Sequence, residues 1–329
     1  MNKPGFIDLQ VNGYAGIDFS DPRTTVDDVL DVAETLHQAG TIGFLATVTT
    51  RPREIMEQCV QTVTTAIKKQ SDRAQVLGIH LEGPFISPEY GFRGAHPADA
   101  VIPPDLTWFK KLQTIASGTI RLVTLAPECE GAVPFIQSVA PEVVVSAGHT
   151  NCTYDQLQRA VRSGLSLASH IGNGCRQMID RHNNPVVNLL ACPEITLSFI
   201  PDGFHLPEAF IRMLFNCRPV EKLVVVSDAV RLAGMPPGKY ITSAGLQVLL
   251  DTSGRLSLAS DPDVLAGSSS NMFRCMNYLA SLGILSEEEL WMVGFSNPLS
   301  ILNIDPQDVA ALQNVARFDR STNQFRLTA

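Results

Sequence analysis

Short apolar runs alternate along this chain with longer segments in which apolar residues recur at helical spacing. Runs of about four to eight apolar residues are typical of buried strands, and a repeat of roughly 3.6 residues is typical of amphipathic helices. Helical patterns fill most of the intervals between the apolar runs, beginning with residues 25–39 and 52–69. The pattern predicts eight strands, at residues 5–11, 42–48, 75–81, 119–125, 142–147, 165–170, 195–200 and 222–228.

This alternation of strands and helices implies right-handed crossover connections and therefore a parallel sheet. The predicted strands at residues 142–147 and 222–228 contain runs that are apolar on both faces, as buried parallel strands are. Eight such units fit a closed (β/α)8 barrel, which is the fold that we predict for this α/β chain. An open doubly wound sheet is the alternative, but no GxGxxG fingerprint follows the first strand.

The pattern changes after the eighth strand. Residues 238–258 combine short β-like pieces with glycine turns and predict a β-hairpin insertion. Further helices are predicted at residues 270–283, 286–295 and 297–303. From residue 304 the chain is more polar and is predicted to be loop-like. We therefore expect one barrel domain over residues 1–303 and a C-terminal tail over residues 304–329.

The composition of the chain limits which binding partners and which cellular compartment are expected. The 329 residues are 45% hydrophobic and 18% charged, which allows a large core, and the formal net charge is −8. An acidic chain of this kind argues against nucleic acid or an anionic membrane surface as its partner. No apolar run reaches transmembrane length, and residues 1–20 lack the pattern of a signal peptide. Seven dispersed cysteines without a CxxC pair indicate reduced thiols, so we expect a cytoplasmic protein.

Polar residues stand at the ends of several predicted strands. The third strand ends at Glu82, the fifth ends near His149 and the sixth ends at His170. In a barrel the C-terminal ends of the strands face the active site, so these three side chains should converge. One carboxylate and two imidazoles suit a divalent transition metal, with zinc as the first choice. Three protein ligands leave a position for water, as catalytic sites do.

A fourth strand end carries Asp228, directly after the apolar run at residues 223–226. A carboxylate at the end of a buried strand is costly unless a charged or reacting group faces it. Across the barrel mouth, Asp228 could take a proton from the water of the metal site. Taken singly, a histidine at a strand end is usually hydrogen-bonded or solvated, and a glutamate in a turn is usually a cap or a surface charge. Four such strand ends together favour a metal site.

Eight stretches of the chain form an ordered set that covers nearly its whole length. They are GFIDLQVNG (5–13), GIHLEGPFIS (78–87), GAH (94–96), SAGHTNCTYDQ (146–156), SHIGNG (169–174), PDGFH (201–205), VVVSDA (224–229) and LAGSSSNM (265–272). In this order they resemble the N-acetylglucosamine-6-phosphate deacetylases of the amidohydrolase superfamily. The combination of HLEGP, AGHTN and DGFH is highly specific, whereas any one of them alone is not. The resemblance therefore implies a metal-dependent amidohydrolase barrel.

The resemblance also implies a role for each matching position. Glu82, His149 and His170 match the family's metal ligands, and Asp228 matches its catalytic acid and base. The matching substrate contacts are Ala95, His96, Asn173, Gly174, Arg181, Asp202, His205, Gly267 and Ser268. In the family, the arginine that Arg181 matches binds the phosphate in the neighbouring subunit's site, so the resemblance implies a homodimer. The planar fork of an arginine suits the oxygens of a phosphate.

Three departures from the family's pattern change these expectations. Many amidohydrolases carry His-x-His at the end of the first strand to hold a second metal, whereas this chain has Gln10 and Asn12. Neutral amides are poor zinc ligands, so we expect one divalent ion, zinc first and iron or another divalent metal as the alternative. The family's small β-sandwich is expected to be absent or reduced to a remnant in residues 304–329. The loop at residues 172–184 also differs, at the phosphate end, and leaves the substrate open.

Together these features predict a metal-dependent hydrolase that removes the N-acetyl group from an amino-sugar phosphate. N-acetylglucosamine 6-phosphate is the expected substrate, and the amine and acetate are the products. Asp228 would accept a proton from water and deliver it to the leaving amine. Two alternatives stay open: a related amidohydrolase that acts on another amide without a phosphate, and a non-catalytic protein that binds a sugar phosphate.

Overall fold

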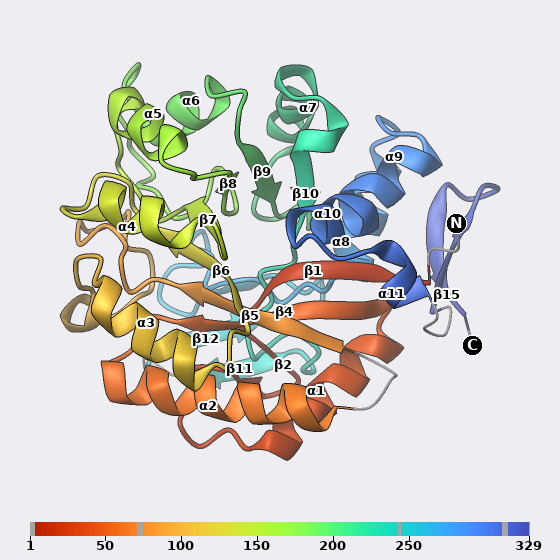
Figure 1. The fold of residues 1–329 in the computed structure, drawn as a ribbon. Helices are drawn as coiled ribbons and strands as arrows, with labels where there is room; N and C mark the ends of the chain where they lie inside the picture. The colour runs from red at the N-terminus through yellow and green to blue at the C-terminus, as the bar shows by residue number, and fades with distance from the viewer. Residues whose placement is uncertain (1–3, 71–74, 243–244, 311–314, 329) are drawn as a thin grey trace.

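The computed structural model describes residues 4–70, 75–242, 245–310 and 315–328. Its eight parallel strands follow one another in chain order and curve into a nearly closed barrel (Figure 1). The strands are β1 (Phe6–Val11), β4 (Thr41–Thr49), β5 (Gln75–Glu82), β6 (Ile120–Leu125), β7 (Val144–Ala147), β8 (Leu167–Ala168), β9 (Thr196–Phe199) and β10 (Leu223–Val225). The predicted eight-stranded α/β barrel is confirmed, although β10 ends earlier than expected.

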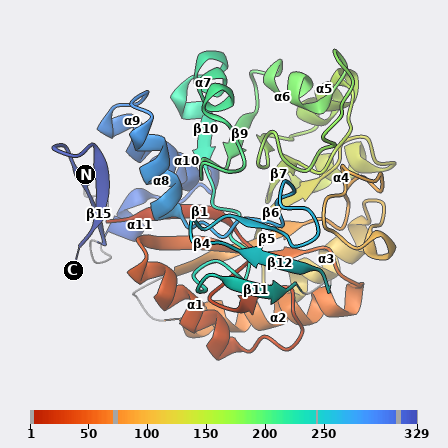
Figure 2. The ribbon, with the colours of Figure 1, turned by 180° about the vertical axis from the view of Figure 1, so that it is seen from behind.

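A helix follows each barrel strand and packs on the outside of the sheet, as Figures 1 and 2 show from opposite sides. These outer helices are α1 (Val26–Gln38), α2 (Arg53–Lys69), α3 (Leu106–Ile115), α4 (Ala132–Val139), α5 (Tyr154–Arg162), α6 (Pro185–Leu190), α7 (Glu208–Cys217) and α8 (Met272–Ser281). In α1, the buried Val29, Val32 and Leu36 lie on one helical face. Thr25 and Asp28 form a capping box that starts this helix.

Polar side chains fill part of the barrel beneath the strand ends. Nε2 of the buried His80 lies 2.7 Å from the Thr124 hydroxyl, which lies 2.8 Å from the Ser169 hydroxyl. The Ser146 hydroxyl is 2.8 Å from the same Ser169 oxygen. Burial lowers the pKa of His80 to about 4, so its ring is neutral near pH 7. The network satisfies these buried groups across neighbouring strands and supports the strand ends above it.

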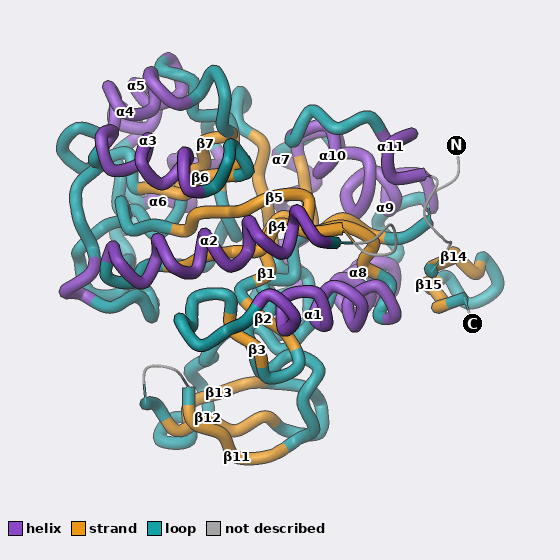
Figure 3. Tube along the Cα trace, turned by 60° about the horizontal axis from the view of Figure 1, so that its bottom comes forward, coloured by secondary structure: helices purple, strands orange, loops and turns teal. Residues whose placement is uncertain are grey.

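Two small antiparallel sheets lie outside the barrel. They consist of β2 (Gly13–Tyr14) with β3 (Ile17–Asp18), and of β11 (Gly238–Ile241), β12 (Gln247–Leu250) and β13 (Leu256–Leu258). The three-stranded sheet has a small core of its own, made by Leu232, Val248, Leu250 and Leu256. Figure 3 shows this sheet set apart from the barrel strands. The β-structure predicted for residues 238–258 is confirmed, with one strand more than a hairpin.

The C-terminal part is more regular than its polar sequence suggested. After α8 come α9 (Glu287–Trp291), a π-helical turn (Met292–Ser296), α10 (Asn297–Ile301), α11 (Pro306–Ala310), and a hairpin of β14 (Ala316–Asp319) and β15 (Gln324–Leu327). The expectation of a loop-like tail was therefore wrong. Phe325 of the hairpin is buried, and its ring centroid lies 4.9 Å from that of Phe6 and 5.0 Å from that of Trp291. Four-residue strands with one buried face leave only a weak sequence pattern.

All seven cysteines of the chain are free thiols. Burial raises the pKa of Cys59, Cys129 and Cys152 to about 12, so these thiols stay protonated at neutral pH. None of the described helices is both long and apolar enough to cross a lipid bilayer.

Candidate active site

Three of the predicted side chains meet at the C-terminal mouth of the barrel. Glu82 is the last residue of β5, and His149 and His170 lie two residues beyond β7 and β8. Oε1 of Glu82 lies 2.9 Å from Nε2 of His170 and 3.3 Å from Nε2 of His149. One ligand atom from each residue lies within 4.8 Å of the others, so the predicted convergence is confirmed. We call these three residues the triad.

The backbone at this mouth adopts conformations that side chains rarely allow. His149 has a φ of 50°, His170 a φ of 33° and Asp228 a φ of 51°. Residues other than glycine seldom adopt left-handed conformations, which cost about 1–3 kcal/mol each and cluster at functional sites. The fold therefore holds three of the four predicted reaction residues against a local preference.

Electrostatics keep the triad's carboxylate ionised. Burial raises the pKa of Glu82, but the hydrogen bonds and charges of His149 and His170 hold it well below its usual range. Burial also lowers the pKa of His170, but its hydrogen bond to Glu82 and the charge of Glu82 raise it overall. A buried carboxylate oxygen and two imidazole nitrogens fit the donor set of a divalent transition metal, zinc included.

Asp228 is tied to the triad by two side-chain amides of β1 and its end. Oδ1 of Asp228 accepts hydrogen bonds from Nε2 of Gln10 at 2.9 Å and from Nδ2 of Asn12 at 2.8 Å. Nε2 of Gln10 also donates to Oε1 of Glu82 at 2.8 Å, so one amide bridges the two carboxylates. Among the described residues, no donor is bonded to Oδ2. Burial and the charge of Glu82 raise the pKa of Asp228.

His96 lies on another side of the triad. Its Nε2 is 3.9 Å from Oε2 of Glu82, and its ring centroid is 4.5 Å from that of His149. Its Nδ1 is 2.8 Å from the Thr50 hydroxyl, so Thr50 determines that Nε2 faces the triad. Burial and the nearby His149 lower the pKa of His96 to about 3, and the ring is therefore neutral. Ala95, which precedes it, is exposed.

The loop after β9 presents His205. Nδ1 of His205 lies 2.8 Å from Oδ2 of Asp202, and Oδ1 of Asp202 accepts from the backbone nitrogens of Phe204 and His205 at 2.8 and 2.9 Å. Burial raises the pKa of Asp202, but the hydrogen bond and charge of His205 hold it below its usual value. The charge of His205 also lowers the pKa of Asp228, so the two groups are within electrostatic reach of each other.

Two further predicted positions lie beside the end of β10. The carbonyl of Ser268 accepts a hydrogen bond from the backbone nitrogen of Val230 at 2.9 Å, and Ser268 pairs with Ala229 in a short parallel bridge. Ser268 is fully buried. Gly267 has a φ of 103°, and a Cβ there would lie 2.7 Å from the Val230 side chain. These two residues thus flank the segment that carries Asp228.

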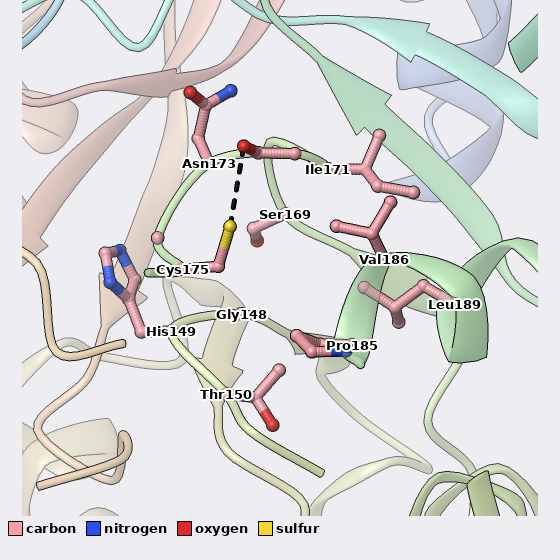
Figure 4. A pocket seen from close by; sticks show the side chains of 12 residues that line it. Gly148, His149, Thr150, Ser169, Ile171, Asn173, Cys175, Pro185, Val186 and Leu189 are labelled. Carbon is pink, nitrogen blue, oxygen red and sulfur yellow. Dashed lines mark hydrogen bonds between the residues drawn. The ribbon is translucent and has the colours of Figure 1, made fainter. Parts of the chain in front are cut away.

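The β8–α6 loop is defined as residues 172–184. Its first four residues line a small cavity, together with residues 148–150 after β7, Ser169 and Ile171 after β8, and side chains of α6 (Figure 4). Gly174 has a φ of 61°, and a Cβ there would lie 3.0 Å from Nδ1 of His149, so a side chain at this position would be strained and would crowd the ring. Nδ2 of Asn173 is buried and has no hydrogen-bond partner among the described residues. Arg181 is exposed, and the described part of the chain offers it no hydrogen bond or ion pair. Its predicted role in binding the phosphate stays a prediction.

Two comparisons relate this chain to known proteins, whereas no protein-family model matches it. An N-acetylglucosamine-6-phosphate deacetylase of Lysinibacillus sphaericus is 32% identical over 289 residues, which are 87% of this chain and 72% of the relative. An N-acetylgalactosamine-6-phosphate deacetylase of Escherichia coli O157:H7 is 31% identical over 306 residues, 92% of this chain and 78% of the relative. The chain belongs to the N-acetylglucosamine-6-phosphate deacetylase family.

A solved member of this deacetylase family has the same fold. The enzyme of Mycobacterium smegmatis, in complex with N-acetyl-D-glucosamine-6-phosphate, superposes with a TM-score of 0.81 at 27% sequence identity. The alignment covers 92% of this chain and 77% of that one. The barrel of the deacetylase family therefore extends over nearly the whole of this chain, and the resemblance seen in the sequence is confirmed.

Sequence reasoning missed several residues that shape this deacetylase-type site. Thr50 orients His96, and Gln10 bridges Glu82 and Asp228 rather than merely replacing a metal ligand. Asp8 on β1 accepts a hydrogen bond from Ser227, next to Asp228. One signal was present in the sequence: Asp8 is a carboxylate inside an apolar strand, two positions before Gln10 and on the same face.

Proposed function

We propose that this chain is a metal-dependent deacetylase that hydrolyses the N-acetyl group of an amino-sugar phosphate. The observation that carries the proposal is the convergence of Glu82, His149 and His170 at the barrel mouth, with Asp228 tied to the same centre. The preferred substrate is N-acetylglucosamine 6-phosphate, on the names of the relatives. N-acetylgalactosamine 6-phosphate is the second candidate, because a relative named for it is almost as similar.

The triad would hold one divalent ion, for which we propose zinc. Its three donors suit that metal, and Gln10 and Asn12 offer only neutral amides where a second ion would need imidazoles or carboxylates. When bound, such an ion polarises the acetamide carbonyl and lowers the pKa of a coordinated water. The Gln10 amide, bonded to Glu82 and Asp228, would keep both carboxylates directed at the same space.

Asp228 would move the proton. Because both amides bind Oδ1, Oδ2 is the oxygen left to accept the proton of the attacking water and to pass it to the leaving amine. The raised pKa of Asp228 makes its carboxylate a stronger base than a solvated one. His96, neutral and held by Thr50, would present Nε2 to the acetamide group or to a sugar hydroxyl, and His205 would contact the sugar.

The phosphate would lie at the β8–α6 loop. Asn173, whose buried Nδ2 has no partner, and the backbone at Gly174 would bind the phosphate end of the substrate. Ala95, Asp202, Gly267 and Ser268 would line the remaining walls. Arg181 would complete the pocket of a second subunit, and we therefore propose a homodimer. Its exposure beside Met178, a side chain that is 87% exposed, supports this assignment.

A deacetylation assay on zinc-loaded protein tests the proposal. Release of acetate from N-acetylglucosamine 6-phosphate should exceed release from unphosphorylated N-acetylglucosamine by at least about tenfold in kcat/KM, since a charge-assisted contact is worth roughly 1.5–3 kcal/mol. N-acetylgalactosamine 6-phosphate belongs in the same panel. Equal rates with and without phosphate would favour the other amidohydrolase, and tight sugar-phosphate binding with no acetate released would favour a binding protein.

A further inference from the structure

The barrel closes between β1 and β10, where few backbone hydrogen bonds join the two strands. We call this junction the β1–β10 seam. Among the described residues the two strands share no regular ladder, and one bridge joins Val11 to Ala229. The backbone nitrogens of Asn12 and Gly13 both donate to the carbonyl of Ala229, at 2.8 and 3.1 Å. Asp228 lies directly in this seam. Its position therefore depends on whatever else holds the seam together.

A buried carboxylate crosses this seam. Asp8 is 1% exposed, and its Oδ2 accepts a hydrogen bond from the hydroxyl of Ser227. Its Oδ1 accepts from the backbone nitrogens of Ser227 and Gln10, both at 3.2 Å. The Ser227 hydroxyl oxygen in turn accepts from the backbone nitrogen of Ala229, at 3.2 Å. Asp8 thus forms hydrogen bonds with Ser227, the residue before Asp228. Through the Ser227 hydroxyl it is also linked to Ala229, the residue after Asp228.

Asp228 is restrained in two ways from the same strand. Asp8, Gln10 and Asn12 stand at alternate positions, so they project from one face of β1. Asp8 holds the backbone around Asp228, whereas Gln10 and Asn12 hold its side chain. The left-handed backbone of Asp228, with a φ of 51°, needs such support because it is unfavourable on its own.

Burying the Asp8 carboxyl group costs desolvation free energy that a purely structural role would not require. No lysine, arginine or histidine of the described chain forms an ion pair with it. Burial raises its pKa to about 7, against the hydrogen bonds from Ser227 and Gln10 that lower it. An apolar side chain would pack in a barrel interior without the desolvation of a carboxyl group. A role at the reaction residue explains why a carboxyl occupies this position.

We propose that Asp8 and Ser227 are positioning residues for Asp228. Their hydrogen bonds across the β1–β10 seam, which we call the clasp, hold the Asp228 carboxylate toward the triad. The inference rests on the proposed function, in which Asp228 moves the proton. It predicts that loss of these hydrogen bonds lowers kcat and leaves KM and metal content unchanged, because within the described residues neither Asp8 nor Ser227 forms a hydrogen bond with the triad or the β8–α6 loop.

Ser227→Ala in the zinc-loaded enzyme is the direct test. A displacement of about 1 Å can cost up to about 10²-fold in rate, so we expect kcat to fall by roughly 10- to 100-fold. Ser227→Thr keeps a hydroxyl and should recover most of the loss. Thr41→Ala is the matched control, because Thr41 is also buried in a barrel strand and its hydroxyl has no hydrogen-bond partner; its kcat should stay within about twofold of wild type.

Two readouts separate positioning from general support. In an Asp228→Asn background, Ser227→Ala should cost little further activity, because both changes affect the same proton transfer. A full additional loss there would overturn the inference. A crystal structure of Ser227→Ala should show Asp228 out of its left-handed conformation or away from Gln10 and Asn12; an unmoved Asp228 would also overturn it. That structural result decides the inference even if the wild type deacetylates no sugar and the proposed function fails.

Discussion

The reaction centre and the β8–α6 loop are held in very different ways. We use reaction centre for the triad together with Asp228. Glu82, His149 and His170 are all less than 10% exposed, and Gln10 bonds both carboxylates of the centre. In the β8–α6 loop, by contrast, residues 176–183 are exposed. Arg176 connects the loop to the neighbouring one, through the Tyr90 carbonyl at 2.9 Å.

This difference explains why the chemistry is easier to infer than the substrate. A centre that is buried and bonded from several strands tolerates few alternatives, because each lost partner leaves an unsatisfied polar group. An exposed loop can change sequence without such a cost. The loop is also where the sequence departs from the family pattern at the expected phosphate end. Each experiment below acts on one side of this comparison.

Loss of the metal should have the largest effect, because it removes the reaction centre altogether. His149→Ala deletes one of three ligands, and we expect bound zinc to fall from about one equivalent to near zero. Deacetylation should then drop below detection. His37→Ala, in α1, is the matched control and should keep its metal. Elemental analysis measures both; two equivalents in the wild type, or normal metal in His149→Ala, would contradict the assignment.

Asp228→Asn should have the next largest effect, because it leaves the shape of the reaction centre intact. Asparagine cannot accept the water's proton, and general acid–base catalysis is worth roughly 10²–10⁴-fold. We expect a loss near the upper end, since Asp228 would act in both halves of the reaction. Steady-state kinetics should place the loss in kcat, with KM and zinc content retained. A variant with nearly normal kcat and a raised KM would make Asp228 a substrate ligand instead.

Arg181→Ala changes the exposed β8–α6 loop rather than the buried reaction centre, and its effect should depend on the substrate. We expect KM for the phosphorylated sugar to rise by about 10- to 100-fold, as for a lost charge-assisted hydrogen bond. Turnover of the unphosphorylated sugar should be unchanged. Arg159→Ala, which removes a positive charge from α5, is the control.

Subunit mixing shows where Arg181 acts. If it completes the partner's pocket, mixing Asp228→Asn protein with Arg181→Ala protein should restore activity, since mixed dimers pair an intact reaction centre with an intact arginine. No recovery after demonstrated subunit exchange would place the arginine in its own chain's site, or outside any site.

The sequence predicted the barrel and the triad because both follow from strong local patterns. Apolar runs mark the strands, and Glu82, His149 and His170 directly follow them. Asp8 and Thr50 were not predicted as site residues, because their roles arise from contacts between strands that no single stretch of sequence displays. Ser227 adjoins Asp228 in sequence, yet its partner Asp8 lies at the opposite end of the barrel's strand order. The hairpin of β14 and β15 was not predicted, because these strands are short and only one face of them is buried.

The last expected effect is on stability rather than on activity, and it tests the buried part of the molecule through Asp8. The pKa of Asp8 is raised from 3.8 to about 7, so between about pH 4 and pH 7 the folded state keeps a proton that the unfolded state has released. Stability linked to this group is therefore fully present below about pH 4 and is lost as pH rises to 7. Each pKa unit corresponds to about 1.4 kcal/mol, which sets an upper limit of about 4 kcal/mol.

Asp8→Asn cannot ionise, so its free energy of unfolding should fall less steeply than that of the wild type over this range. Urea unfolding of metal-free protein at several pH values measures the difference, which includes the change in the pKa of Asp228 when the nearby Asp8 charge is removed. Asp105→Asn provides a contrast of opposite sign, because the hydrogen bond from the Trp108 backbone nitrogen lowers the pKa of Asp105. For that partly exposed cap, the advantage of the wild type over Asp105→Asn should be lost as pH falls. Parallel curves for the wild type and Asp8→Asn would mean that folding leaves the pKa of Asp8 unchanged, and that the β1–β10 seam holds a charged carboxylate over most of this pH range.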